Sequence, residues 1–301
     1  MVRTLVISSA CRLSIRNEQL LIDNGQDPPA TRHMPDVGYL IIEHPQVTYS
    51  HAVLMRAADC NTVVVICDGR HMPAALMLPM QAHHLPGKRF GRQLAASDPL
   101  KKNLWKQVVQ AKLTNQAAVL EVLGRESTPL LTWSRHVQSG DSTGREAAGA
   151  RHYFRQLFGE AWLRDPDGDP PNNLLNYGYT ILRAAVARSL VGAGLLPLAG
   201  LFHHNQYNAY PLADDLMEPF RPFVDLLAWE IHQSEPEPSL RLEKEHKAAL
   251  LSVLQADCKV GENTRPLQVA IDQASISLAQ CYEGKARRLI FPALRPTARR
   301  K

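Results

Sequence analysis

The sequence predicts an α+β fold, in which a small β-rich domain over residues 1–90 precedes a larger, nearly all-helical domain over residues 96–301. Two observations carry this prediction. Short apolar runs separated by turn residues fill the first part of the chain, whereas apolar residues recur at helical spacing after Pro86-Gly87. A chain of 301 residues is also long enough for two domains that each bury a core.

The strands of the first domain are predicted from apolar runs at residues 5–7, 13–15, 20–22, 39–42, 63–66 and 76–78. Asn24-Gly25, Pro28-Pro29 and Asp68-Gly69 lie between these runs, where tight turns are expected. Residues 51–58 interrupt the pattern and predict one short helix between strands.

The helices of the second domain are predicted from apolar residues that recur three and four positions apart. Asp98-Pro99 marks the start of the first helix, and Gly124 is the expected C-terminal stop. Pro266 stands where a first-turn proline is expected in the last helix. Similar patterns cover roughly 143–159, 173–192, 212–233, 240–256 and 266–283.

Charge and cysteine content narrow the class of protein. The 34 basic and 29 acidic residues leave a net charge of +5, which is compatible with a polyanionic partner. The five cysteines are scattered and form no CxxC pair, so neither a disulfide framework nor a zinc ribbon is supported, and a cytoplasmic location is expected. No apolar run reaches the roughly 18 residues of a membrane span, and the N-terminus does not read as a signal peptide.

Two short segments of the helical half contain residue types that could carry chemistry. Thr143-Gly144-Arg145-Glu146 matches a capping box, and this structural interpretation is the stronger one when the segment is taken alone. His203 and His204 follow an apolar run, so they are expected at the edge of a buried segment. A histidine there is more often structural than a metal ligand.

The third segment, residues 212–222, places three acidic residues on one stretch of helix. Asp214 and Asp215 lie four and three positions before Glu218, so like charges become neighbours and destabilise the helix unless a cation offsets them. One interpretation is a solvated face with Arg221 and with Arg183 or Arg188 nearby. The other is a site for Mg²⁺ or Mn²⁺, since carboxylate oxygens and one imidazole suit these ions.

Longer motifs of the chain resemble those of a known protein family. The string GLFHHNQYNAYPLADDLMEPFRPFVD, residues 200–225, closely resembles the signature of the CRISPR-associated spacer-acquisition endonuclease and integrase family, the "Cas-one" family. It is most similar to the form that accompanies single-protein (type II) effector systems. Further agreement with the family lies in residues 104–117, 140–146, 153–159 and 173–179.

The resemblance implies a fold and a metal site. It implies a β-sandwich-like N-terminal domain used for dimerisation, and a helical catalytic domain that binds DNA and one Mg²⁺ or Mn²⁺. Carried over residue by residue, the family's ligands are Glu146, His203 and Glu218, which are also the catalytic residues. Asp214 and Asp215 remain alternatives to Glu218, and His204 is expected to be a bystander.

One departure from the family pattern affects the first ligand. Relatives often have glycine directly after the first glutamate, whereas Ala147-Ala148 precede Gly149 here. A small residue is retained, so the helix is expected to persist. Glu146 is nevertheless the ligand whose position the motif defines least well.

The implied activity is the insertion of new spacer DNA into a CRISPR array by attack of a DNA 3′ hydroxyl on a phosphodiester. The implied partners are double-stranded DNA, a second copy of the chain and a small ferredoxin-like CRISPR-associated protein. Basic residues on the predicted helices are candidates for phosphate contacts. Those selected are Lys106, Lys112, Arg151 and Arg183.

Two other functions share these sequence features. A metal-dependent nuclease acting in repair or on branched DNA would use every one of the same ligands, and only joined products separate it from an integrase. A non-enzymatic helical DNA-binding or scaffold protein would leave the acidic segment as a solvated face. Metal dependence distinguishes that protein from both enzymes.

Overall fold

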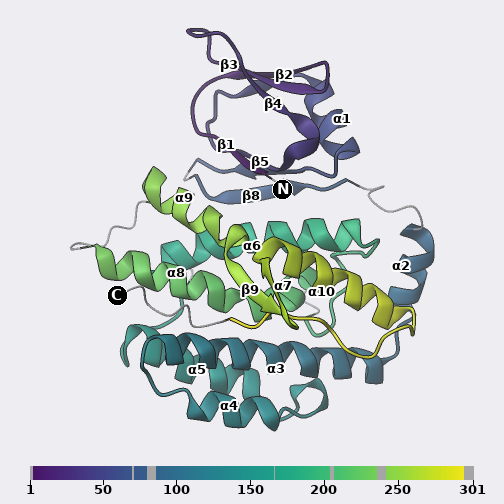
Figure 1. Cartoon of the computed structure of the whole chain (residues 1–301), viewed down its shortest axis with the longest axis vertical. Coiled ribbons are helices and arrows are strands. Elements are labelled where there is room, and N and C mark those ends of the chain that lie inside the picture. The colour runs from purple at the N-terminus through teal and green to yellow at the C-terminus, as the bar shows by residue number, and fades with distance from the viewer. Residues whose placement is uncertain are drawn as a thin grey trace.

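The computed structural model describes residues 3–69, 71–79, 86–165, 167–203, 207–235 and 242–294. Figure 1 shows a β-rich part at one end of the molecule and a larger helical part at the other, with helix α6 (Asn172–Gly192) running beneath the β-rich part. The predicted fold class is confirmed.

Two four-stranded sheets make up the β-rich part. Strands β1, β5 and β7 of the first sheet run parallel, and β8 is antiparallel. The order in this sheet is β1 (Arg3–Ile7), β5 (Val37–Ile42), β7 (Val63–Cys67) and β8 (Pro73–Met77). The order in the second sheet is β4 (Ala30–His33), β3 (Gln19–Asp23), β2 (Arg12–Arg16) and β6 (Thr48–Tyr49).

Five of the six predicted apolar runs lie wholly in strands, and the sixth, residues 76–78, extends one residue past β8. The predicted short helix is α1 (His51–Asp59). Sequence patterns missed β4 and β6. The four residues of β4 are all exposed and carry no apolar alternation, and β6 has only two residues.

The first sheet is covered on both faces, so the β-rich part shares its core with the helices. Leu40 and Val64 pack towards the second sheet and α1. Tyr39, Ile41 and Val65 point to the opposite face and join the helical core, because successive side chains of a strand alternate between faces. This explains why β5 reads as a continuous apolar run, since every one of its residues is buried.

The helical part surrounds two long helices, α6 and α3 (Asp98–Val122). Helices α7 to α10 pack around α6, whereas α4 and α5 pack on α3. The remaining helices are α2 (Pro86–Leu94), α4 (Thr128–Arg135), α5 (Arg145–Phe158), α7 (Pro211–Met217), α8 (Arg221–Ser234), α9 (Lys244–Ser252) and α10 (Leu267–Tyr282).

The predicted helix over 212–233 is divided. A 3₁₀ turn, Glu218–Phe220, separates α7 from α8. Pro219 and Pro222 lack the backbone N–H that an uninterrupted α-helix uses, which favours a change of helix type at this point. Glu218 therefore lies at a junction between helices instead of on a regular helix face.

The helical part also contains elements that the periodicity did not predict. Helices α2 and α4 were missed, and residues 257–266 form a hairpin of β9 (Asp257–Val260) and β10 (Asn263–Pro266). Pro266 ends β10 and caps α10, so the expectation of a first-turn proline was wrong. Within the described residues, no helix has the length and apolarity needed to cross a membrane.

Candidate active site

Glu146 lies in the first turn of α5, and a neighbouring aspartate positions it. The two carboxylate oxygens of Asp141 accept hydrogen bonds from the backbone N–H groups of Arg145 and Glu146, at 2.9 Å each. The N-cap residue is Gly144, with φ of 62°, so the capping box of Thr143 and Glu146 is not formed. Because Asp141 caps the helix, the Glu146 side chain is free to reach α3.

Lys112 of α3 joins the two candidate glutamates. Its ammonium contacts Glu146 Oε1, and it lies 2.5 Å from Glu218 Oε2. The Lys112 side chain is only 8% exposed, so it belongs to a buried cluster and not to a charged surface. Burial alone would lower the pKa of Lys112, but the charges of Glu218 and Glu146 outweigh burial and raise it. Lys112 is therefore positively charged.

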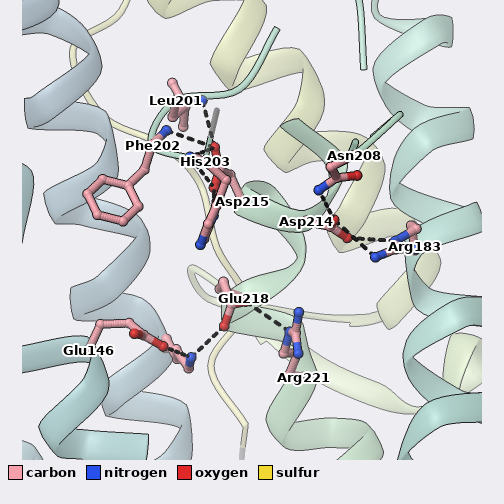
Figure 2. A network of polar contacts seen from close by, with 11 residues as sticks. Glu146, Arg183, Leu201, Phe202, His203, Asn208, Asp214, Asp215, Glu218 and Arg221 are labelled. Atoms are coloured by element: carbon pink, nitrogen blue, oxygen red, sulfur yellow. Dashed lines mark hydrogen bonds and ion pairs between the residues drawn. The ribbon is translucent and has the colours of Figure 1, made fainter. Parts of the chain in front are cut away.

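Glu218 is held from both sides by positive charge. Arg221 Nε lies 3.0 Å from Glu218 Oε1 (Figure 2), whereas the Lys112 ammonium contacts the other oxygen, Oε2. Burial opposes ionisation of Glu218, but Arg221 and Lys112 outweigh burial and lower the pKa of this carboxyl. Glu218 is ionised in a buried position, which is the state that a metal ligand needs.

His203 is oriented by Asp215, whose side chain is fully buried. Asp215 accepts hydrogen bonds from the backbone N–H groups of Leu201 (2.6 Å) and Phe202 (2.9 Å), and His203 Nδ1 lies 2.5 Å from its Oδ1. Since a carboxylate only accepts, Nδ1 carries the proton, and in the neutral ring Nε2 is the nitrogen with a lone pair. The hydrogen bond to Asp215 raises the pKa of His203, although partial burial opposes the shift.

The segment carrying His203 requires glycine at position 200. A Cβ atom on Gly200 would lie 2.4 Å from the His203 carbonyl oxygen and 3.1 Å from Asp215 Oδ2. The chain can therefore fold tightly over the Asp215 carboxylate only without a side chain at this position.

The other two acidic residues of the motif, Asp214 and Asp215, are already bound to other groups of the protein. Asp214 is bound by Arg183, with Nε to Oδ1 at 2.6 Å and Nη2 to Oδ2 at 3.0 Å, and Asn208 donates a further hydrogen bond at 2.7 Å. Asp215 holds the His203 segment. Figure 2 shows both carboxylates turned towards these partners. Glu218 instead contacts the Lys112 ammonium, which also contacts Glu146. This arrangement favours Glu218 over both alternatives as the acidic ligand, whereas His204 lies outside the described residues.

The donor set fits a small hard cation. Oxygens of Glu146 and Glu218 converge on a single cationic nitrogen, the Lys112 ammonium. Within the described residues no three His, Cys, Asp or Glu side chains stand together at ligating separation. Lys112 occupies the position between the carboxylates, so a metal ion could bind both only after this ammonium moves.

The basic residues predicted to contact DNA differ in setting. Arg151 on α5 is exposed, and Lys106 on α3 is half-buried. Arg183 is bound to Asp214, and Lys112 lies inside the glutamate cluster. Sequence reasoning placed Lys112 on a DNA-binding surface, whereas the structure places it inside the candidate metal site. The residues one helical turn before and after Lys112 on α3, Val108 and Gln116, give no sequence signal that Lys112 belongs to the candidate metal site.

A second buried polar group, formed by Asp225 and Tyr179, lies next to Arg221. Asp225 is 1% exposed, it accepts a hydrogen bond from Tyr179 Oη, and the Arg221 guanidinium lies 4.6 Å from the centre of the Tyr179 ring. Burial raises the pKa of Asp225 to about 7, although the Tyr179 hydrogen bond opposes this shift. Both residues lie in segments that resemble the family, 200–225 and 173–179, but no sequence pattern assigned a role to either of them.

The raised pKa of Asp225 predicts a pH dependence of stability. The folded state holds the Asp225 proton more tightly than the unfolded state, whose pKa is about 4, so stability should fall as pH rises from about 4 to about 7. Asp225→Asn removes this penalty. The melting temperature of the variant, relative to wild type, should therefore rise between about pH 5 and about pH 8.

Asp59→Asn at an exposed position is the matched control and should show no such change. A difference in melting temperature between Asp225→Asn and wild type that does not vary with pH would contradict this account of Asp225.

Comparison with known proteins places this chain in a family. The model of the family described as CRISPR associated protein Cas1 matches residues 4–253, a range that contains Glu146, His203 and Glu218. The chain belongs to the Cas1 family. The resemblance inferred from the motifs is thereby confirmed.

Relatives with curated names and solved structures agree with this membership. The CRISPR-associated endonuclease Cas1 of Neisseria meningitidis serogroup C (strain 8013) is 38% identical over 234 residues, covering 77% of this Cas1-family chain and 76% of the relative. A casposase bound to integration product has a TM-score of 0.77 at 20% identity, covering 100% of this chain and 95% of the other. A Cas6-RT-Cas1–Cas2 complex has a TM-score of 0.76 at 20% identity, covering 98% of this chain and 36% of the other. At such identities the two structures establish the Cas1 fold alone.

Proposed function

We propose that this chain is a divalent-metal-dependent DNA endonuclease and integrase that inserts new spacer DNA into a CRISPR array. The observation that carries the proposal is the convergence of Glu146 and Glu218 on one cation position, near a histidine oriented by Asp215. The Neisseria relative is named an endonuclease, and the casposase was solved with an integration product. Both names agree with phosphodiester chemistry at this site.

Glu146, Glu218 and the free Nε2 of His203 are the groups that would hold Mg²⁺ or Mn²⁺. When bound, such an ion supplies Lewis-acid stabilisation of a phosphoryl oxygen and favours deprotonation of the attacking hydroxyl or water. Asp215 keeps the Nδ1 proton in place and so presents Nε2 as a lone pair. Arg221 keeps Glu218 ionised and in position.

The positive charge of Lys112 can serve this site in two ways. In the present arrangement its ammonium neutralises Glu146 and Glu218, which would otherwise repel each other in a buried setting. If a metal ion displaced it, the ammonium would stay tethered to α3 near the two glutamates and could reach a phosphate bound there. There it would stabilise the negative charge that develops during displacement.

The proposed partners are double-stranded DNA, a second copy of the chain and a small ferredoxin-like CRISPR-associated protein. Presence of a Cas1–Cas2 complex among the structural relatives supports the heteromeric assembly. Self-association is assigned to the β-rich part, where the edge strand β4 exposes all four of its residues.

Metal removal tests the chemistry at this site. Cleavage of plasmid DNA should require Mn²⁺ or Mg²⁺, should disappear in excess EDTA and should return when the metal is restored, because oxygen ligands predominate. DNA binding measured by fluorescence anisotropy in EDTA is the control, and it should persist. Undiminished cleavage in EDTA would exclude the proposed metal site.

A further inference from the structure

The Arg221 guanidinium is held by an aromatic ring as well as by Glu218. Its central carbon lies 4.6 Å from the centre of the Tyr179 ring, which is a cation–π contact. Its Nε lies 3.0 Å from Glu218 Oε1, the contact drawn in Figure 2. Tyr179 belongs to α6, whereas Glu218 and Arg221 lie where the 3₁₀ turn meets α8. One guanidinium therefore joins the candidate metal site to helix α6.

The Tyr179 ring is itself fixed at its hydroxyl. Tyr179 Oη donates a hydrogen bond to Asp225, and the two residues are 7% and 1% exposed. Asp225 lies one helical turn after Arg221 on α8, so the acceptor of the hydroxyl and the cation on the ring share one helix face. The ring cannot swing away from Arg221 without breaking a buried hydrogen bond, which is costly.

A second guanidinium limits movement around the same ring. The Arg164 guanidinium lies 5.4 Å from the centre of the Tyr179 ring. Its Nη1 and Nη2 donate hydrogen bonds to Asn172 Oδ1 (2.9 Å) and Asn176 Oδ1 (2.6 Å) in the first two turns of α6, so this cation is anchored. Like charges repel, so Arg164 opposes movement of Arg221 towards it and favours the position of Arg221 next to Glu218.

The placement of Arg221 decides which oxygens of Glu218 remain available. A guanidinium is a planar fork that pairs readily with both oxygens of a carboxylate. Here Glu218 Oε2 lies 2.5 Å from the Lys112 ammonium, which also contacts Glu146, so Oε2 faces the cation position that the two glutamates share. A released Arg221 fork would cover Oε2 as well as Oε1 and withdraw Glu218 from that position.

We infer that Tyr179 is a positioning residue of the metal site: by stacking against Arg221 it restricts this guanidinium to Oε1 of Glu218 and leaves Oε2 for the metal ion. The inference rests on the proposed function, because it concerns the ion proposed to bind Glu218. Tyr179 acts on that ion only through Arg221, so its aromatic face is the property that matters.

Mn²⁺ affinity, measured by electron paramagnetic resonance on DNA-free protein, tests this role without catalysis. Tyr179→Leu removes the aromatic face and should bind Mn²⁺ about tenfold more weakly than wild type, the size expected when a group that orients a metal ligand is lost. Tyr179→Phe keeps the ring and should stay within about threefold of wild type.

Tyr177→Leu is the matched control for loss of a buried tyrosine. Tyr177 belongs to the same helix and is fully buried, its hydroxyl donates to Glu43 at 3.3 Å, and Lys247 lies over its ring. The contacts are of the same kind but involve neither Arg221 nor Glu218. Tyr177→Leu should therefore bind Mn²⁺ as wild type does.

A double variant separates the positioning of Arg221 from a general loss of packing. Tyr179→Leu combined with Arg221→Lys replaces the fork by an ammonium, which acts as a point charge and cannot span both oxygens. Mn²⁺ affinity of the double variant should return to within about threefold of wild type, whereas a packing defect would not be reversed. Failure of the double variant to recover would count against the positioning role.

A fluorinated ring tests the same role if Tyr179→Leu folds poorly. The residue 3,4,5-trifluorophenylalanine at position 179 keeps the shape of the ring and weakens the negative charge on its face, which attracts the guanidinium. It should bind Mn²⁺ more weakly than Tyr179→Phe. Equal affinities would exclude the cation–π contact as the cause.

The crystal structure of the metal-free variant, with leucine or the fluorinated ring at position 179, gives a readout that does not depend on metal binding. Arg221 should contact both carboxylate oxygens of Glu218 in that structure. An Arg221 that stays on Oε1 alone would overturn the role of Tyr179 even if DNA cleavage requires metal. Conversely, wild type that binds no Mn²⁺ would reject the proposed function, whereas the changed Arg221 contact would still show that Tyr179 controls access to Glu218.

Discussion

Single replacement of Glu146, His203 or Glu218 by alanine is expected to lower metal-dependent DNA cleavage by orders of magnitude and to leave DNA affinity nearly unchanged. Each variant removes one group assigned to the metal, whereas most of the binding energy comes from phosphate contacts elsewhere. Cleavage rates and Mn²⁺ affinity are measured together. Both should fall in all three variants if these residues hold the ion.

Controls for these variants follow from the local contacts. Glu160→Ala removes an exposed glutamate that pairs with Arg155 outside the site, so it should retain activity. Glu218→Ala also leaves Lys112 and Arg221 buried with one counter-charge fewer, and Glu218→Gln keeps the shape of the side chain while removing its charge. Asp215→Ala should also be slow, because it releases His203. An active Glu218→Ala beside an inactive Asp215→Ala would show that the acidic ligand was assigned to the wrong residue.

Blocking the DNA 3′ ends with dideoxy nucleotides is expected to abolish joining completely while hydrolytic nicking continues. Joining uses the 3′ hydroxyl as nucleophile, whereas hydrolysis at the same site uses water. The purified chain, its small CRISPR-associated partner and a short labelled duplex are incubated with a supercoiled plasmid that bears a repeat. Insertion is expected at staggered positions flanking the repeat, because two ends joined to opposite strands require two copies of the site.

Omission of the partner protein and the Glu146→Ala variant are the controls for this assay. Joining that survives the dideoxy block would exclude the 3′ hydroxyl mechanism. Nicking without joining under every condition tried would favour a nuclease that acts in repair or on branched DNA.

Much of the fold could be predicted from local pattern, because burial repeats every second residue in a strand and every three to four residues in a helix. The apolar runs of β1, β2, β3, β5, β7 and β8 identified these strands correctly. Prediction failed where the pattern is absent, as in the exposed β4. It also failed where proline divides a continuous periodicity, as at the 3₁₀ turn between α7 and α8.

The sequence by itself determined the family and the fold class, because these depend on residue identities within contiguous motifs. It also supplied the candidate ligands Glu146, His203 and Glu218, with Asp214 and Asp215 left as alternatives to Glu218. Only the tertiary structure decided how the remaining charges are used. It assigned Asp141 to the α5 cap, Asp215 to His203 and Lys112 to the space between the two glutamates. The physical reason is that an ion pair depends on distances between α3, α5 and the turn at Glu218, which the packing of those elements sets. No spacing along the chain specifies them.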